Sequence, residues 1–268
     1  MTLGKAGVIG AVSLALVGAG SAAKAGLVDE YFVFSDVPDS AWVLQGTSVS
    51  RTFSHEVNDL AIAVGVSVRA LQWDLGGNGS EYDLDGNVIG LNLYAPIPGM
   101  SGQALDGTTD GSTYNYTGEW FADGTVFRTD RDWANAVALF NTGLDIVGIT
   151  YDGATNSLWI SDDEGSVYNY SLTGVVLSSF NPGAIGRFGS LAWEPSTDTL
   201  WGIVNETSQL YQFSKGGTQL DSFFIEDFGN VWGGEFQMEP VPEPASLGLL
   251  GMGLVGLAAR RRGRSRQR

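Results

Sequence analysis

Short runs of alternating apolar and polar residues, separated by turns rich in Gly, Asn and Asp, repeat along the middle of the chain. Residues 148–159 and 190–201 align at an offset of 42 residues, and in each segment a polar turn leads to a second run that opens with Leu-Trp. Both continue with aromatic residues two apart, at 167–170 and 210–213, then with a Gly-containing turn and a fourth run. A period of two is typical of strands, and such turn clusters are typical of hairpins. The pattern therefore predicts units of four short antiparallel strands.

The same pattern extends more weakly toward both ends. Residues 104–140 fill one further unit and residues 60–91 another, so first strands begin near 60, 103, 148 and 190. A fifth first strand begins near Gly234, where the sequence echoes residues 189–195. The three strands that this last unit lacks can come from the N-terminus, at 31–34, 41–44 and 48–53.

Four strands per unit, at a spacing in the low forties, are typical of β-propeller blades. We therefore expect an all-β domain over residues 26–240, with five blades closed by N- and C-terminal strands. Six blades or a β-sandwich are the alternatives. The aromatic-x-aromatic…Gly pattern over residues 60–240 resembles NHL-like propeller repeats. That broad class includes binding scaffolds, lyases and hydrolases, so the resemblance says little about function.

The C-terminal segment combines three features in order. Pro242 and Pro244 flank Glu243 in an extended Pro-Glu-Pro segment, which can join neither a helix nor a central strand. Residues 245–259 carry no charge, and a helix of this length covers about 22 Å, short of the ~30 Å core of a bilayer. The basic end that follows can extend toward the lipid headgroups and favours a cytoplasmic location; it opens with Arg260, Arg261 and Arg262.

Taken together, residues 241–268 resemble the PEP-CTERM sorting signal of Gram-negative bacteria. The resemblance implies a short C-terminal transmembrane helix that anchors the protein transiently, and cleavage near Pro-Glu-Pro by an exosortase. It also implies release or attachment at the surface of bacteria that make exopolysaccharide or biofilm. The match covers only about a tenth of the chain and implies nothing about the domain upstream.

The N-terminus has the three parts of a secretory signal peptide. Lys5 is the basic residue, residues 6–20 are apolar, and Ala23 and Ala25 form an A-x-A site for signal peptidase. We therefore assign residues 1–25 to the signal and expect the mature protein to begin near Gly26.

Removing both ends changes the charge of the domain. Residues 26–239 carry twenty-nine acidic and six basic side chains, hence about −23, against −16 for the whole chain. Nucleic acid and anionic lipid would be repelled, whereas neutral glycans and cations are compatible with this charge. The chain has no cysteine, which excludes disulfides, thiolate catalysis and Cys-ligated metals.

Catalytic and metal-binding patterns are weak. His55 is the only histidine; without a G-x-S-x-G motif or a second histidine, we interpret it as a surface or turn residue at a strand end. Asp83, Asp85 and Asn87 offer oxygen ligands two apart, but the positions of Gly and Glu do not fit a calcium loop. We favour a hairpin turn there, with calcium as the alternative and no other cofactor expected. The acidic turn at 162–165 is interpreted as solvated.

Acidic and aromatic residues leave two functions open. Glycoside hydrolysis needs two carboxyl groups about 5–10 Å apart across a cleft, and so many acids give no single candidate pair. The acids that stand in first strands, near strand ends, are Asp106, Asp152, Glu194 and Glu239. Trp159, Trp193 and Trp201 are expected in the core, whereas Trp120, Trp133 and Trp232 could be exposed for sugar stacking.

We therefore expect an exported, non-enzymatic binding or structural propeller of the cell surface or extracellular matrix, with extracellular polysaccharide as the candidate partner. An extracellular carbohydrate-active hydrolase on the same scaffold is the alternative. No catalytic residue is nominated. A deep funnel holding two or three converging carboxylates would favour the hydrolase, and a plugged or shallow axis with only Gly, Ser and apolar residues would favour the binding protein.

Overall fold

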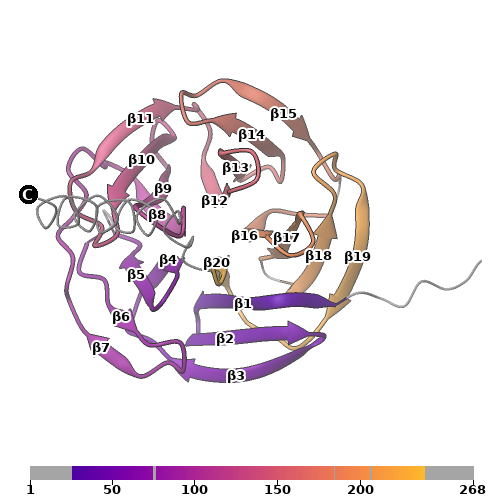
Figure 1. Ribbon diagram of the computed structural model, residues 1–268, viewed down its shortest axis with the longest axis horizontal. Coiled ribbons are helices and arrows are strands. Elements are labelled where there is room, and N and C mark those ends of the chain that lie inside the picture. Colours follow the sequence, from indigo (N-terminus) through magenta and orange to yellow (C-terminus); the bar gives the residue numbers. More distant parts are fainter. Residues whose placement is uncertain (1–25, 75–76, 184, 206, 239–268) are drawn as a thin grey trace, which may run out of the picture.

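Five four-stranded antiparallel sheets surround a common axis as the blades of a propeller (Figure 1). The computed structural model describes residues 26–74, 77–183, 185–205 and 207–238. Within each blade the strands follow one another from the axis to the rim, and each blade has the four antiparallel strands predicted from the repeat. Five blades are confirmed, so the alternatives of six blades and a β-sandwich were wrong.

The strands of the blades fall where the repeat places them. The first blade comprises β4 (Asp59–Val64), β5 (Val68–Gln72), β6 (Glu81–Tyr82) and β7 (Val88–Gly90). The second comprises β8 (Gln103–Thr109), β9 (Tyr114–Trp120), β10 (Thr125–Asp130) and β11 (Val137–Asn141). The third comprises β12 (Ile146–Asp152), β13 (Ser157–Asp162), β14 (Val167–Ser171) and β15 (Val176–Phe180). The fourth comprises β16 (Phe188–Glu194), β17 (Thr199–Val204), β18 (Gln209–Phe213) and β19 (Gln219–Phe224).

The closing blade joins the two ends of the described chain. Its strand order is β20 (Val231–Phe236), β1 (Leu27–Asp36), β2 (Asp39–Gly46) and β3 (Ser48–Ser54). β20 lies innermost and pairs antiparallel with β1, with Tyr31 opposite Phe236. This arrangement confirms the predicted closure, and it joins the first and last segments of the domain through hydrogen bonds within one sheet.

The hydrophobic core of the described residues is divided among the contacts between blades. Each pair of neighbouring blades shares one cluster of buried side chains, and a sixth cluster surrounds the axis. Innermost strands approach one another so closely that a Cβ on Gly189 would lie 1.8 Å from the Val231 carbonyl oxygen. Glycine is therefore required where β16 meets β20.

Repeated carboxylate–indole pairs explain the Leu-Trp positions of the repeat. The Nε1 of Trp159 donates to Asp152 Oδ2 at 3.2 Å, and the equivalent Nε1 of Trp201 donates to Glu194 Oε2 at 3.0 Å. In both blades the acid ends the first strand and the tryptophan lies in the second. All four side chains are buried, so these two acids are structural partners of the core tryptophans.

The three tryptophans whose position was left open are also buried. Trp120, Trp133 and Trp232 are at most 9% exposed, so none presents an open ring to a sugar. The interpretation of His55 as a surface residue was wrong. It does follow the end of β3, but its ring is buried, stacks on Phe34 and lies 2.9 Å from the Ser35 carbonyl oxygen.

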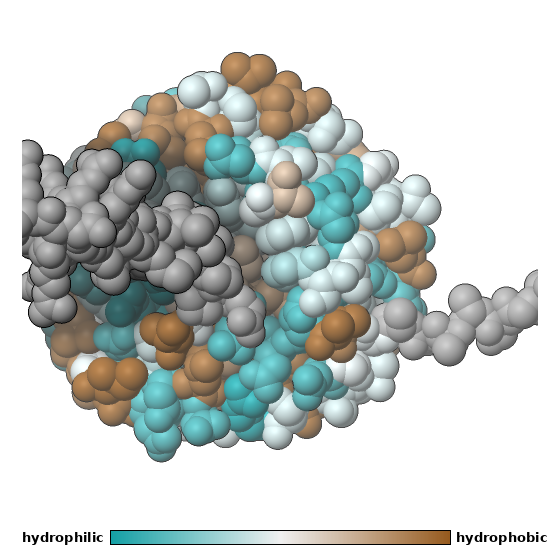
Figure 2. Space-filling view, viewed as in Figure 1, coloured by the Kyte–Doolittle hydropathy of each residue, from teal (hydrophilic) through white to brown (hydrophobic). Residues whose placement is uncertain are grey.

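Exposed apolar side chains gather on the outermost strands. They include Val88 and Ile89 on β7, Val137 on β11, Val176 and Leu177 on β15, and Leu220 and Phe224 on β19. Figure 2 shows hydrophobic residues around the rim, separated by polar ones. No helix among the described residues is long and apolar enough to cross a membrane, and the segment expected to do so lies outside them.

Candidate functional site

The axis of the propeller is occupied by a buried carboxylate. Asp106 Oδ1 accepts the N–H groups of Gly107 and Gly234, at 2.9 and 3.1 Å, and Oδ2 accepts those of Ile149 and Leu191, at 3.0 and 3.3 Å. These donors lie on β8, β20, β12 and β16, so one side chain links the innermost strands of four blades. Burial raises the pKa of Asp106, and its backbone hydrogen bonds oppose that rise.

A second buried carboxyl group lies close to Asp106 at the same axis. Glu235 is fully buried, its Oε1 accepts the N–H of Phe236 at 3.0 Å, and the hydroxyl of Thr150 lies 3.3 Å from Oε2. The Thr150 hydroxyl in turn accepts the N–H of Trp193. Burial raises the pKa of Glu235, as it does for the Tyr31 hydroxyl, which hydrogen-bonds Ser190 on the axis.

The two axial acids are thus sealed within the fold. Asp106 is 2% exposed and Glu235 is 0% exposed, and their oxygen atoms meet backbone N–H and threonine hydroxyl groups. Acid–base catalysis requires carboxyl groups within reach of a substrate. Buried Asp106 and Glu235 therefore fill the axis, which is neither the deep funnel expected for the hydrolase nor the axis with only Gly, Ser and apolar residues expected for the binding protein.

The axis ends at two faces of the propeller, and these faces differ in composition. We call the face where the innermost strands end, which contains Met238, the exit face. The opposite face contains the connections that enter the innermost strands. At its centre, the Trp120 ring stacks on the exposed Phe121 with 3.5 Å between ring centroids, and Trp120 lies 5.6 Å from Trp232. The Arg187 guanidinium lies over Trp232 at 4.9 Å.

Phe121 is held in an unusual backbone conformation. Its φ of 57° is in the left-handed region, which bulky residues rarely adopt. The Phe121 N–H donates to Asp145 Oδ1 at 3.1 Å, which fixes the turn between β9 and β10. With 64% of its surface exposed, Phe121 offers an aromatic surface beside the centre of the opposite face.

An acidic cavity of about 290 Å³ adjoins this aromatic group through Asp145. It is lined by Gly143, Leu144, Asp145, Asp162, Asp163, Glu164 and Tyr168. Asp162 accepts N–H groups from Glu164 and Ser166, so the predicted acidic turn is ordered by its own carboxylate, and burial raises the pKa of Asp162. Asp163 pairs with Arg187 at 2.7 Å. The cavity therefore presents carboxylate and hydroxyl oxygens beside an exposed ring.

A cavity of about 310 Å³ lies at the centre of the exit face. It is lined by Asp29, Asp110, Gly153, Trp193, Pro195, Ser196, Gln237 and Met238. These residues come from four blades, and Asp29 and Met238 belong to the two ends of the described chain. Lys215 borders this face, where it pairs with Asp152 at 2.7 Å and with Asp198, and lies over the Trp193 ring.

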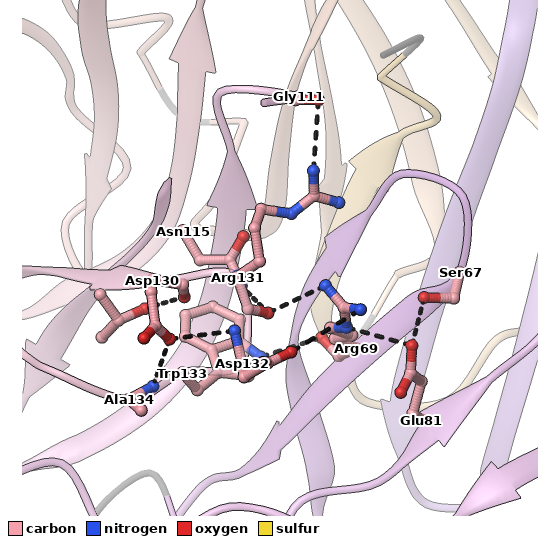
Figure 3. A network of polar contacts seen from close by, with 11 residues as sticks. Ser67, Arg69, Glu81, Gly111, Asn115, Asp130, Arg131, Asp132, Trp133 and Ala134 are labelled. Atoms are coloured by element: carbon pink, nitrogen blue, oxygen red, sulfur yellow. Dashed lines mark hydrogen bonds and ion pairs between the residues drawn. The ribbon is translucent and has the colours of Figure 1, made fainter. Parts of the chain in front are cut away.

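A polar network connects the first and second blades on the exit face (Figure 3). Arg69 donates to Glu81 at 3.1 Å and to the Arg131 carbonyl oxygen at 3.1 Å, and lies 3.7 Å from Asp132. The indole of Trp133 donates to the Arg69 carbonyl oxygen. These bonds fix the hairpin that follows β10 against β5.

A further cavity lies beside this network. Its volume is about 560 Å³, and it is lined by Glu81, Leu93, Tyr94, Ala95, Pro96, Pro98, Asp132, Trp133, Ala134 and Asn135. The Tyr94 hydroxyl is buried and has no hydrogen-bond partner among the described residues, and burial raises its pKa. The cavity is mostly apolar, with carboxylates at its edge.

The predicted calcium-like segment forms a hairpin turn. Asp83 Oδ1 accepts the N–H groups of Asp85 and Asn87, and the Asn87 amide donates to Asp83 Oδ2 at 2.8 Å. In the part of the chain that the structure describes, no group of three or more acidic or histidine side chains is arranged for a metal ion. Glu239 and the residues of the signal and sorting segments lie outside the described residues.

Comparison with known proteins supports the analysis of the C-terminus. Residues 240–262 match the PEP-CTERM protein-sorting motif. The protein is thus a five-bladed β-propeller that carries this sorting motif, which indicates export. No curated protein matches the chain.

Among solved structures, the chain is similar to one in a crystal structure of the nidogen/laminin complex, at a TM-score of 0.53 and 11% identity. The match covers 79% of this chain and 99% of that one, and it shows the fold alone. A protein of unknown function from Bacteroides caccae matches with a TM-score of 0.48 and 10% identity, over 75% of this chain and 74% of the other.

Proposed function

We propose that the protein is an exported, exosortase-processed propeller that acts as a non-enzymatic binding component of the cell surface or extracellular matrix. In this proposal, signal peptidase removes residues 1–25, and residues 241–268 anchor the protein in the inner membrane until exosortase cuts near Pro-Glu-Pro. The mature domain is then residues 26–240.

The observation that carries the proposal is the position of Met238. β20 ends at Phe236, and Met238 lines the central cavity of the exit face, two residues before the matched motif at 240–262. A short connection of this kind would keep the exit face toward the bilayer while the anchor is in place. The opposite face would then point away from the membrane.

The exposed aromatic ring on that opposite face favours a neutral glycan as the ligand. Aromatic rings bind the apolar faces of sugars, and a few polar groups beside them give orientation. Phe121 supplies the ring. The Asp145 carboxylate can accept hydrogen bonds from sugar hydroxyl groups, and the Tyr168 hydroxyl can donate or accept them. The strong negative charge of the domain disfavours anionic polysaccharide.

Glycan-array and hydrolysis assays on the full-length protein in detergent test the proposal. We expect binding of a neutral polysaccharide without turnover, and at least tenfold weaker binding for Phe121→Ala. Phe224→Ala removes a similarly exposed ring on the rim and serves as the matched control, with unchanged binding. Turnover of the polysaccharide would establish the hydrolase instead, and the absence of binding to any glycan would exclude this ligand class.

A further inference from the structure

The outermost strand of the third blade presents an apolar edge to solvent. β15 is the last strand of its sheet and, among the described strands, pairs with β14 alone. Three consecutive apolar side chains at its start are exposed: Val175 by 59%, Val176 by 51% and Leu177 by 54%. Figure 2 shows hydrophobic side chains at the top of the molecule, where β15 lies in Figure 1. An exposed apolar edge of this kind is a template for pairing with another strand.

The outermost strands of the other four blades are less suited to pairing. β3 contains Arg51, which is bound to Glu30, and β19 contains Asp221. β7 has only three residues. β11 is uncharged, but its Leu139 and Phe140 are partly buried in the cluster between the second and third blades. β15 differs from β11 because its first four side chains are all exposed, so they are free to contact a partner.

The charge around β15 indicates that the partner is a second copy of this chain. The sequence has no charged residue from Gly165 to Gly186, although residues 26–239 carry about −23. Two domains of this charge repel each other wherever their acids meet, so an uncharged edge is the place where they can come together. A basic partner would instead gain from a strand that contains an acid, such as β19 with Asp221.

The direction of β15 allows two copies to pair without turning either one over. Figure 1 looks along the propeller axis, and in this view β15 follows the circumference of the propeller with β14 inside it. Two antiparallel copies of an edge strand are related by a two-fold axis perpendicular to their sheet, which here is parallel to the propeller axis. Both exit faces then point the same way. If the proposed function holds, both copies can therefore be anchored in one membrane.

We propose that β15 pairs antiparallel with β15 of a second copy, so that two propellers associate side by side. The pair is symmetric about Ser178, the middle residue of the strand. A strand of this length spans about 17 Å, and one strand pair buries less than the about 1,200–2,000 Å² of a stable interface. The dimer is therefore weak in solution, and confinement of anchored copies to one membrane favours it. It places two opposite faces beside each other, where one polysaccharide can contact both.

Cross-linking tests the pairing in the full-length protein in a neutral detergent. The chain has no cysteine, so Ser178→Cys supplies a single thiol, which should lie with its Cβ about 5 Å from that of its copy. A short bismaleimide should then give a cross-linked dimer, whereas Gln219→Cys, on the exposed start of β19, should stay monomeric. Raising the ionic strength from about 0.1 M to about 1 M should increase the dimer fraction, because salt screens the repulsion between the two acidic domains.

Leu177→Lys in the Ser178→Cys background places two like charges across the strand pair, and it should reduce the cross-linked fraction at least tenfold. Leu220→Lys is the matched control: it adds the same charge at a side chain of β19 that is 52% exposed, and it should leave cross-linking unchanged. Circular dichroism checks that both variants fold.

Three results would each refute β15 as the interface: a dimer that survives Leu177→Lys, equal cross-linking through Gln219→Cys, or a monomer at every protein concentration. The glycan-array assay separates this inference from the proposed function. Glycan binding by a protein that does not cross-link would overturn the pairing alone, and cross-linking without glycan binding would overturn the proposed ligand alone.

Discussion

Replacing Asp106 with asparagine would test whether one carboxylate organises the centre of the propeller. The substitution keeps the shape of the side chain, but an amide nitrogen then faces two N–H groups where a carboxylate oxygen had accepted them. A buried donor without an acceptor costs about 1–3 kcal/mol, so Asp106→Asn should lose about 2–6 kcal/mol. That is a large part of the ~5–15 kcal/mol by which a domain is usually stable.

Urea unfolding of the full-length protein in detergent, followed by tryptophan fluorescence, measures this loss. Asp85→Asn is the control, since Asp85 is exposed in the turn before β7 and its substitution should change stability by less than about 0.5 kcal/mol. An Asp106→Asn midpoint equal to that of the wild type would refute the reasoning, because it would show that the four N–H groups do not depend on a charged acceptor.

Three further substitutions test other buried contacts by the same unfolding assay. Burial raises the pKa of Asp59 to about 7 from 3.8, so the folded state binds an extra proton and stability should fall as pH rises between about 4 and 7. Asp59→Asn should make this fall smaller than in the wild type, as midpoints at about pH 5 and 8 would show. Glu194→Ala leaves the Trp201 indole and two N–H groups of β1 without an acceptor and should cost about 3 kcal/mol or more. Gly189→Ala drives a methyl group into the Val231 carbonyl and should prevent cooperative unfolding at the wild-type midpoint.

The blades could be predicted from the sequence because each repeats a local pattern. The Leu-Trp pairs mark the second strands of the third and fourth blades, and Gly, Asn and Asp turns separate strands elsewhere. The similarity near Gly234 identified a strand that pairs with the N-terminal strand β1. In the first blade, Val66 lies in an exposed bend and the second strand begins only at Val68. There the apolar pattern continues through a turn, so periodicity alone misplaces its boundary.

The axial residues could not be predicted because they do not repeat. Asp106 corresponds to Gly148 and Ser190 in the next two blades, so no repeated motif marks it. The only feature of the sequence that distinguished Asp106 was an acidic residue in an otherwise apolar first strand. Similarly, nothing near His55 in the sequence indicates that it stacks on Phe34, twenty-one residues earlier, and becomes buried. Contacts across blades set both environments.

The two ends of the described chain meet at one face, which constrains how a tethered propeller can work. Asp29, close to the expected start of the mature protein, and Met238, close to the sorting motif, line the same cavity. The N–H groups of Val28 and Asp29 are fixed there by Glu194, and Met238 is fixed by Val64. Under the proposed function, the described residues nearest to both signals lie at the exit face, so the opposite face would carry no tether. A ligand that binds Phe121 would then be accessible before as well as after the sorting segment is cut, and its affinity should be the same for the anchored and the released protein.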